Sequence, residues 1–274
     1  MHQVEGWKSV RDALNTIDRI ALGFLTQVEW RWLKMVRYFD MHITTSHSFG
    51  TDSIPEMVKM AERLELDTIC IADAIETPDQ FMQIKKEIAA LKSTVNILLG
   101  VEIIAKNLQD MANKVNRFRE LADIIIVSGG DLDINRAACE NPKVDILAHP
   151  ESKRKDSGLD HVMVAAAAKN KVAIELNFRS FLYSTGRQRA YLLSGMQRNA
   201  MLCKKFDAPL IVTSAAENIW EMRAGKDLST LAYLCGMDVE NAINTVSSIP
   251  EFLARRVKEI KSLGFVMPGV KVVQ

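Results

Sequence analysis

The chain has 274 residues, of which 48% are hydrophobic and 25% charged, and its formal net charge is +1. This composition is ordinary for a soluble globular protein, and the length suits one large domain. No uncharged apolar run approaches the roughly 20 residues of a membrane span, and the N-terminus lacks a signal pattern, so we expect a cytoplasmic protein without a membrane partner. The four widely spaced cysteines argue against a disulfide framework and against structural zinc.

Residues 1–34 carry an apolar stripe with spacings of three and four, which predicts an N-terminal helical extension before a domain over 35–274. Such a helix would cover one end of the domain or bind a partner as a coiled coil. A further alternative is that the natural chain starts at Met35. The stripe consists of Trp7, Val10, Leu14, Ile17, Ala21, Phe24 and Val28.

From residue 36 onward, seven apolar runs rich in β-branched residues alternate with helix-like stretches. Runs without clean alternation are typical of parallel strands that are buried on both faces. No Gly-x-Gly-x-x-Gly turn follows the first run, which disfavours a doubly wound sheet. The sequence therefore predicts an α/β fold, a distorted TIM-like (β/α) barrel of about seven parallel strands. The expected strands are 36–44, 68–72, 95–105, 124–128, 144–148, 172–178 and 210–214.

Helix starts between these strands are marked by capping residues. Two of them form capping boxes with Glu56 and Gln80 and have Pro in the first turn. The sequence further predicts a long helix over 187–206 and shorter helices near 217–224, 228–235, 239–246 and 250–262. The expected capping residues are Ser53, Thr77, Asn107 and Asp160.

The small net charge hides a strong asymmetry along the chain. Residues 35–148 carry 12 Lys and Arg against 18 Asp and Glu, whereas residues 149–206 carry 11 against 4. A basic segment of this kind predicts a surface for a polyanion. The alternative is that these basic side chains lie on solvated helix faces all round the molecule.

Side chains with metal-ligand chemistry stand at the ends of several expected strands. The carboxyl ends of parallel strands form the active-site rim of a barrel. Carboxylate and imidazole ligands there could hold Zn, Mn or Fe ions that activate water against a phosphate ester, and Glu175 lies nearby on the sixth strand. The candidate set, a vestigial metal site, is Asp40, His42, Asp73, Glu102 and His149.

Five short motifs follow one another in the order Phe39–His42, Gly100–Ile103, Asp145–Pro150, Ala173–Arg179 and Pro209–Ala216. Over about residues 36–246 this layout resembles the polymerase-and-histidinol-phosphatase superfamily of distorted barrels. It resembles one divergent branch more closely, the thirty-kilodalton protein subunit of ribonuclease P, which is called protein component 3 in archaea.

Departures from the metal-dependent pattern bear on function. By resemblance, metal-dependent members carry His-x-His on the first strand, Asp-His after the second and Asp-x-His after the last. This chain has Asp40 in the first slot, Ala74 in the second, and Ser214 and Ala216 in the third. Alanine has no lone pair to offer a metal, so a cluster of two or three ions cannot be assembled by that scheme. A single ion at the remaining ligands stays open.

The resemblance implies a protein subunit of the ribonuclease P ribonucleoprotein, which removes the 5′ leader of precursor tRNA endonucleolytically. It implies that the subunit binds and stabilises the catalytic RNA without cleaving by itself, that it binds no cofactor, and that the RNA subunit uses magnesium. The implied partners are ribonuclease P RNA, protein component 2 in a two-plus-two heterotetramer, and other protein subunits. Precursor tRNA would be the substrate of the complex.

The densest part of the basic segment interleaves Arg with aromatic residues in an expected loop that leads into a helix. This mixture suits phosphate contacts and base stacking, and a basic cluster just after His149 would add salt-dependent phosphate contacts. A solvated loop is the alternative, and Arg117 and Arg119 are lesser candidates. The candidate RNA-binding residues are Arg179, Arg187, Arg189, Arg198, Lys153, Arg154 and Lys155.

Two other function classes remain open at this point. The first is a metal-dependent phosphoesterase of the polymerase-and-histidinol-phosphatase type with a reduced metal site, which would purify with a bound transition metal. The second is a structural module that positions protein partners and never touches RNA. A filter-binding assay with structured RNA would separate this class from an RNA-binding subunit.

Overall fold

The computed structural model describes residues 36–260, 265–267 and 270–271, and the chain from Arg37 onward forms one compact unit. The expected helical extension over 1–34 lies outside the described residues. Among the described helices, none combines the length and the apolar character needed to cross a membrane.

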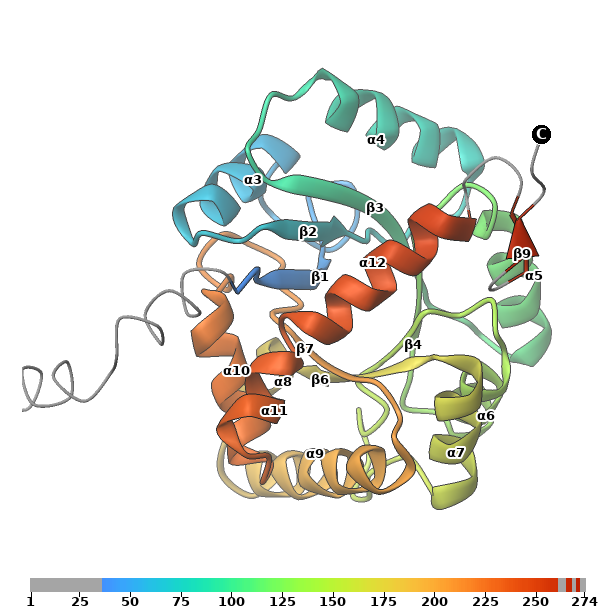
Figure 1. Cartoon of the computed structure of the whole chain (residues 1–274), viewed down its shortest axis with the longest axis vertical. Helices are drawn as coiled ribbons and strands as arrows, with labels where there is room; N and C mark the ends of the chain where they lie inside the picture. Colours follow the sequence, from blue (N-terminus) through green and yellow to red (C-terminus); the bar gives the residue numbers. More distant parts are fainter. Residues whose placement is uncertain (1–35, 261–264, 268–269, 272–274) are drawn as a thin grey trace, which may run out of the picture. The chain divides into compact units, whose positions relative to one another are not determined.

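Seven parallel strands lie side by side in sequence order, each paired with the next (Figure 1). Every expected strand contains the observed one, so the prediction of a seven-stranded (β/α) barrel is confirmed. The observed strands are shorter at several ends, because the flanking apolar residues pack without joining the ladder. The strands are β1 (Phe39–Ile43), β2 (Thr68–Ile71), β3 (Asn96–Ile103), β4 (Ile124–Ser128), β5 (Ile146–Ala148), β6 (Ala173–Asn177) and β7 (Leu210–Thr213).

The ring of strands is nearly closed between β7 and β1. A single parallel bridge joins Ile43 to Ala216, and the Thr44 N–H donates to the Ala216 carbonyl at 2.9 Å. Lower down, the Asp40 carboxylate accepts the backbone N–H of Ser214 at 3.0 Å. The ladder between β7 and β1 is thus incomplete, and a side chain replaces part of it. The barrel is distorted at this seam.

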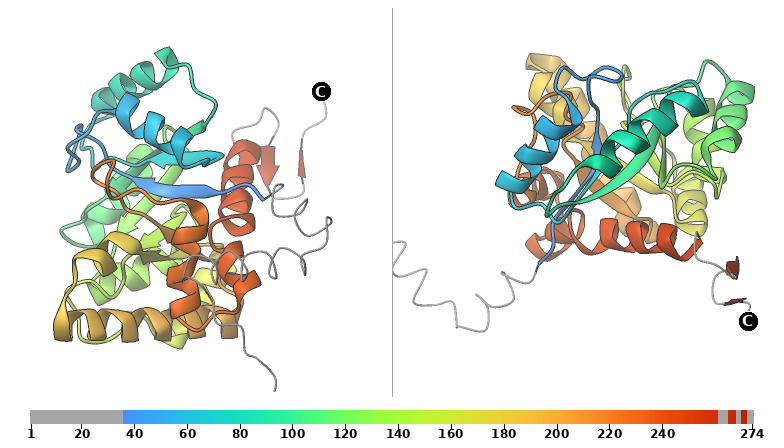
Figure 2. Two further views of the ribbon diagram at one scale, coloured as in Figure 1. Left: turned by 90° about the vertical axis from the view of Figure 1, so that its left-hand side faces the viewer. Right: turned by 90° about the horizontal axis from the view of Figure 1, so that it is seen from above.

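Alternate strand residues point into the barrel and fill it with apolar side chains, as the period of two dictates. One end of this interior is covered by α12 (Ser248–Ile260), which crosses the barrel beside the amino ends of the strands (Figures 1 and 2). The carboxyl ends of the strands are left for a site. The interior cluster contains Phe39, Met41, Cys70, Ala72, Leu98, Ile124, Ile126, Ile146, Ala148, Ala173, Ile211, Leu253 and Ala254.

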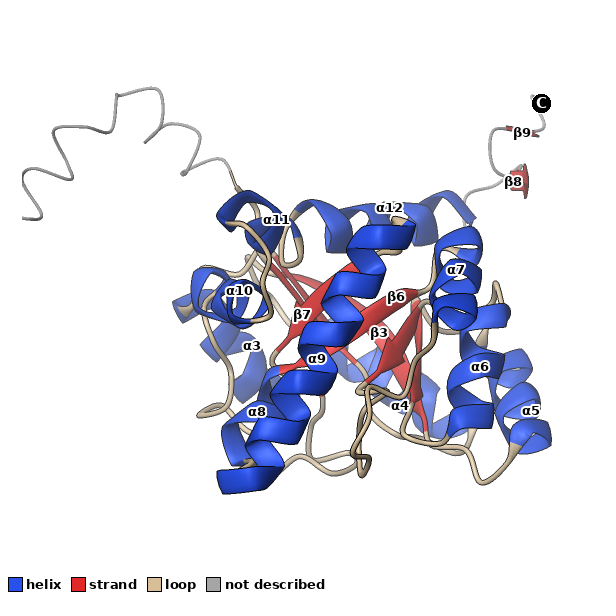
Figure 3. Cartoon of the chain, turned by 90° about the horizontal axis from the view of Figure 1, so that it is seen from below, coloured by secondary structure: helices blue, strands red, loops and turns tan. Residues whose placement is uncertain are grey.

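Helices surround the strands (Figure 3). A second, larger core of buried apolar side chains lies between the strands and the helices. The capping boxes of Ser53 and Thr77 are present, and Asn107 and Asp160 each accept a backbone N–H of the first turn, so these four predicted helix starts are confirmed. The predicted helices correspond to α3 (Ile54–Arg63), α4 (Pro78–Ala90), α5 (Leu108–Phe118), α7 (His161–Asn170), α9 (Gly186–Phe206), α10 (Gly225–Leu234), α11 (Val239–Asn244) and α12.

The prediction of a helix near 217–224 is wrong. This stretch consists of bends and turns after the bridge at Ala216. Its backbone N–H groups are taken by side chains instead of by a helical ladder: Ile219 donates to Asp52 at 2.7 Å, and Glu217 donates to Glu221 at 2.8 Å. Competition from nearby carboxylates for backbone donors explains why the helical pattern is not realised.

The structure also contains elements that the sequence pattern did not predict. The expected loop after β6 includes a short helix, α8 (Phe178–Tyr183), which starts where Asn177 accepts the Ser180 N–H at 2.8 Å. A further helix, α6 (Leu132–Glu140), is capped by Asp131. The strands β8 (Phe265–Met267) and β9 (Val270–Lys271) pair as an antiparallel hairpin. The helix α8 and the strands β8 and β9 are too short to repeat an apolar pattern, whereas α6 is nine residues long.

Candidate functional site

The carboxyl ends of the strands turn from apolar to polar along the face that points into the barrel. Glu102 continues the interior face of β3, because it follows Leu98 and Gly100 by the strand period of two. By the same count Glu175 follows Ala173 on β6, and Ser128 follows Ile126 on β4. The barrel mouth is therefore lined with carboxylates and hydroxyls where its lower part is lined with aliphatic groups.

Two histidines pair with the two carboxylates. His42 Nδ1 lies 2.7 Å from Glu175 Oε1, and His42 Nε2 lies 3.7 Å from Glu102 Oε2. His149 Nε2 lies 3.8 Å from Glu102 Oε1, while its backbone N–H donates to Glu175 Oε2 at 3.1 Å. Hydroxyl donors complete the set, because Thr213 donates to Glu175 at 2.6 Å and Ser128 donates to Glu102. We call His42, Glu102, His149 and Glu175 the mouth cluster.

The charge states within the mouth cluster support one another. Burial works against the charged form of all four groups, but the carboxylates outweigh it at the histidines, so the pKa of His42 is raised well above its usual value and the pKa of His149 is raised too. Contacts with the histidines likewise lower the pKa of Glu102 and of Glu175 in spite of their burial. Protonated histidines and ionised carboxylates therefore stabilise one another within the mouth cluster.

The structure brings together His42, Glu102 and His149 of the candidate metal set, with Glu175 beside them. It places Asp40 at the seam between β1 and β7. Asp73 caps a turn, where it accepts from the Thr45 N–H at 2.8 Å, from the Thr45 hydroxyl at 2.7 Å and from the Ser48 hydroxyl at 2.6 Å.

Among the described residues, no three or more His, Cys, Asp or Glu side chains are arranged to hold a metal ion. In the mouth cluster, His42 Nδ1 and the Glu175 carboxylate are taken up by their contact with each other, and Glu102 also accepts from Ser128. A metal ion would have to displace these partners and compete with the protons that the carboxylates favour on the histidines, since imidazole binds metal in its neutral form.

A cavity of about 220 Å³ opens above the mouth cluster. Two of its lining residues hold left-handed backbone conformations without being glycine, His149 with φ of 34° and Ala215 with φ of 49°. Such conformations persist where the surrounding structure imposes them, and they concentrate at functional sites. His149 Nδ1 is buried and has no hydrogen-bond partner among the described residues.

Three of the predicted RNA-binding cations are engaged within the protein. Arg179 contacts Glu217 at 2.6 Å and Glu221 at 2.9 Å, and its guanidinium lies 5.0 Å from the centre of the Tyr183 ring. Arg189 donates to backbone carbonyls at the end of α8. Arg154 contacts Asp156 at 2.7 Å. These three arginines hold the local structure and have less capacity left for a phosphate.

The other four predicted cations are exposed and make no hydrogen bond or ion pair with any residue of the described part of the chain. Lys153 and Lys155 lie in the loop after β5, and Arg187 and Arg198 lie on α9. We call Lys153, Lys155, Arg187 and Arg198 the free cations. Neighbours along the sequence thus differ in availability, a distinction that the sequence pattern did not show.

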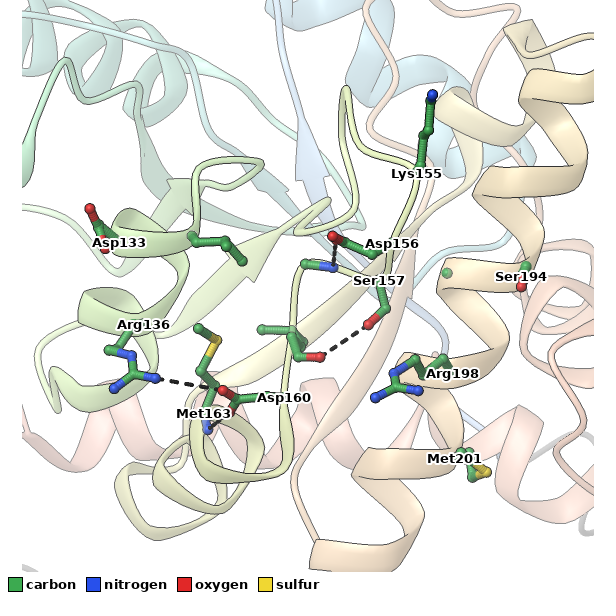
Figure 4. Close-up of a pocket in the computed structure, with 14 residues that line it drawn as sticks. Asp133, Arg136, Lys155, Asp156, Ser157, Asp160, Met163, Ser194, Arg198 and Met201 are labelled. Atoms are coloured by element: carbon green, nitrogen blue, oxygen red, sulfur yellow. Dashed lines mark hydrogen bonds and ion pairs between the residues drawn. The ribbon is translucent and has the colours of Figure 1, made fainter.

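A second cavity, of about 920 Å³, lies between α6, the segment 155–160 and α9. Figure 4 shows Arg136 from α6 on one side and Arg198 from α9 on the other, with the 155–160 segment between them. Arg136 contacts Asp160 at 3.5 Å, and Met201 contributes an exposed apolar side chain to the same rim. Arg136 was not predicted from the sequence, because it lies in the acidic segment 35–148 and on α6, a helix that was not predicted.

The chain was compared with known proteins. The family model described as RNase P subunit p30 matches residues 37–261. Ribonuclease P protein component 3 of Methanosarcina mazei is 31% identical over 225 residues, which cover 82% of this chain and 91% of that protein. The same component of Methanothermobacter thermautotrophicus is 34% identical over 221 residues, which cover 79% of this chain and 88% of that protein.

Among solved structures, a chain from the cryo-EM structure of archaeal ribonuclease P with mature tRNA superposes with a TM-score of 0.70 at 30% identity. The match covers 85% of this chain and 98% of that one. Residues 37–261, which the family model matches, contain all seven barrel strands, the mouth cluster and the free cations. This chain therefore belongs to the ribonuclease P subunit p30 family.

Proposed function

We propose that this chain acts in ribonuclease P as an RNA-binding protein subunit, and that the holoenzyme removes the 5′ leader of precursor tRNA. The match to the p30 family over residues 37–261 is the observation that carries the proposal. The solved relative comes from a ribonuclease P complex with mature tRNA, which agrees with RNA and protein partners. The four free cations supply positive charge for phosphate contacts that the protein itself does not neutralise.

The isolated subunit is proposed to be catalytically silent and to bind no cofactor, with magnesium serving the RNA subunit. Two features support this. Ala74 and Ala216 stand where metal-dependent relatives of the barrel carry ligands, and the side chains of the mouth cluster are paired with one another. Metal analysis of the purified chain and assays on phosphate monoesters should find little. Robust turnover that His149→Ala abolishes would instead favour a phosphoesterase.

The protein partner is proposed to be ribonuclease P protein component 2, in a two-plus-two heterotetramer within the cytoplasmic ribonucleoprotein, beside other protein subunits. The basis is family membership. Co-expression of the two proteins followed by a mass measurement in solution should give the four-chain complex. Two stable proteins that never associate would contradict this pairing.

The RNA contact is tested with the free cations. Substituting Lys155 or Arg198 by Gln should weaken binding of ribonuclease P RNA across sequences and lower the salt slope by about one counterion each. Leader removal by the reconstituted complex should then require more magnesium, because lost protein cations leave phosphate repulsion for the metal to screen.

The matched controls are exposed lysines on and just after the helices of the acidic half, Lys59, Lys85 and Lys92. Substituting these by Gln should leave the affinity and the salt slope nearly unchanged. If both sets of variants weaken binding equally, the basic segment is only a solvated face.

A further inference from the structure

Two cavities at the carboxyl end of the barrel adjoin each other, and we treat them together as one groove. The 220 Å³ cavity above the mouth cluster and a neighbouring cavity of about 420 Å³ share Ser152 and Ser180 as lining residues. The loop after β5 forms one wall of the groove, and α8 with the start of α9 forms the other. We call this the mouth groove. It runs from Phe49 at the barrel mouth to Tyr183 and Lys153 at its outer end.

An aromatic side chain is presented at the inner end of the mouth groove. Phe49 lines the cavity, yet 57% of its surface is exposed. It sits on a turn that is held rigidly, because Asp73 accepts three hydrogen bonds from Thr45 and Ser48 and because the Gly50 N–H donates to the Thr45 carbonyl at 3.0 Å. A Cβ at Gly50 would lie 2.7 Å from the Thr44 carbonyl oxygen, so this close approach requires glycine. An exposed Phe on a fixed turn is a preorganised contact.

A second aromatic side chain is fixed at the outer end. The Tyr183 hydroxyl donates to Glu221 at 2.6 Å, and the Arg179 guanidinium lies 5.0 Å from the ring centre. Tyr183 nevertheless exposes 61% of its surface, which leaves ring area free for a further contact. The ring is therefore held in place by two interactions and still open to a ligand.

The exposed charge of Lys153 at the mouth groove favours an anionic ligand, and the two aromatic side chains favour one that also carries flat rings. Lys153 is exposed and makes no ion pair within the described residues, while the carboxylates near it have cationic or imidazole partners: Glu217 and Glu221 share Arg179, and Glu102 contacts the histidines. Burial raises the pKa of Glu151, which lines the same groove, to about 7, so much of its charge is removed.

We propose that the mouth groove binds a single-stranded segment of RNA, with one base against Phe49, another against Tyr183 and a backbone phosphate at Lys153. The proposal deepens the function proposed above, on which it rests, by naming the class of RNA and the place where it binds. Stacking on protein aromatic rings requires bases that are unstacked from a helix, which excludes the interior of a duplex. Ser152, Ser180 and Gln188 add hydroxyl and amide groups that can reach sugar and phosphate oxygens.

The test measures binding of the full chain to a fluorescent single-stranded RNA of about eight nucleotides, within the site sizes known for single-strand binding surfaces. Phe49→Ala and Tyr183→Ala should each weaken binding by about tenfold, the typical effect of losing one stacked base. Tyr183→Phe keeps the ring and should retain most of the affinity. Tyr233→Ala is the matched control, since Tyr233 on α10 is 58% exposed and lines none of these cavities. An RNA duplex of the same length should bind less tightly and should not respond to the aromatic variants.

Unchanged affinity of the Phe49→Ala and Tyr183→Ala variants for the single strand would overturn the mouth groove as the site. If such variants still bind ribonuclease P RNA in a salt-dependent way, the proposed function survives that failure. If the unmodified chain does not bind ribonuclease P RNA at all, the proposed function itself is overturned. Circular dichroism of each variant separates a lost contact from a lost fold, and equal sensitivity of duplex and single strand would also refute the proposal.

Discussion

The mouth cluster and the basic segment 149–206 are both rich in charge, and they use it in opposite ways. In the mouth cluster, two histidines and two glutamates are paired with one another inside the barrel, with contacts of 2.7–3.8 Å. In the basic segment, the four free cations stand exposed on α9 and on the loop after β5, and their side chains make no hydrogen bond or ion pair with the described residues. The difference lies in which charges the fold leaves unpaired.

This contrast distinguishes charges that stabilise the fold from charges that are available to bind a ligand. Charges that are buried and paired cost stability when one partner is lost, whereas exposed charges contribute little to stability and remain available to a ligand. Arg179 lies in the basic segment but behaves like a member of the first group, because it is held by Glu221, which is largely buried. Arg154 is also paired, but its partner Asp156 is exposed. Stability measurements and binding measurements should therefore divide the two regions.

The largest expected effect is that of Glu175→Gln. Glu175 is fully buried and accepts from His42, Thr213 and the His149 backbone. The substitution removes the carboxylate nearest His42 and leaves the two histidines to share Glu102 alone. The free energy of unfolding at neutral pH should fall by about 3 kcal/mol, as for other buried pairs broken on one side. Chemical denaturation of both proteins measures it.

The matched control is the exposed pair of His47 and Glu87, whose contact is 2.8 Å. Glu87→Gln should change the free energy of unfolding by less than about 0.5 kcal/mol, because exposed ion pairs are weak. Similar losses at Glu175 and Glu87 would show that burial does not separate the two pairs.

The next effect concerns pH. Burial, the dominant cause, raises the pKa of Asp40 from 3.8 to about 6, against the hydrogen bonds from Ser214. The folded protein thus keeps this proton to a higher pH than the unfolded chain does, so its contribution makes the protein less stable as the pH rises from about 4 to about 6. The loss amounts to about 3 kcal/mol. Asp40→Asn cannot titrate, so unfolding measured across this range should show a stability curve without that decline, and parallel curves for the two proteins would contradict the assignment.

The smallest effects distinguish arginines within the basic segment. Arg198→Gln should lower the salt slope of RNA binding by about one and change the free energy of unfolding by less than about 0.5 kcal/mol. Arg179→Gln should do the reverse, with little change in salt slope and a stability loss of about 1 kcal/mol, because Glu221 is largely buried and loses a partner. Salt titrations of binding, paired with denaturation curves, compare the two variants, and identical behaviour would remove the distinction between held and free cations.

Much of the fold could be predicted from the sequence, because its signals are local. Apolar runs gave all seven strands, and capping residues such as Ser53 and Asp160 marked where helices begin. The failures have other causes. The stretch 217–224 loses its helix because side chains such as Asp52, distant in the sequence, take its backbone donors. The short helix α8 offers less than two turns of pattern.

The candidate site was predicted only in part. Glu102, His42 and His149 were placed together because strand ends meet at one rim of a barrel, and this follows from topology alone. Asp73 carries the same residue type at the same kind of position, yet it caps the turn that presents Phe49. Nothing in its sequence context distinguishes a ligand from a cap, because that depends on which hydroxyls fold back toward it.

The sequence by itself determined the order of strands and helices, the family motifs and the net charges of the segments 35–148 and 149–206, because all of these are properties of residues along the chain. The tertiary structure decided which charges are compensated. Arg179 and Arg187 are eight positions apart in one basic stretch, but only Arg179 meets carboxylates, which come from residues 217 and 221. Pairing of this kind depends on distances of a few ångströms between segments far apart in the sequence, and only the packed barrel fixes those distances.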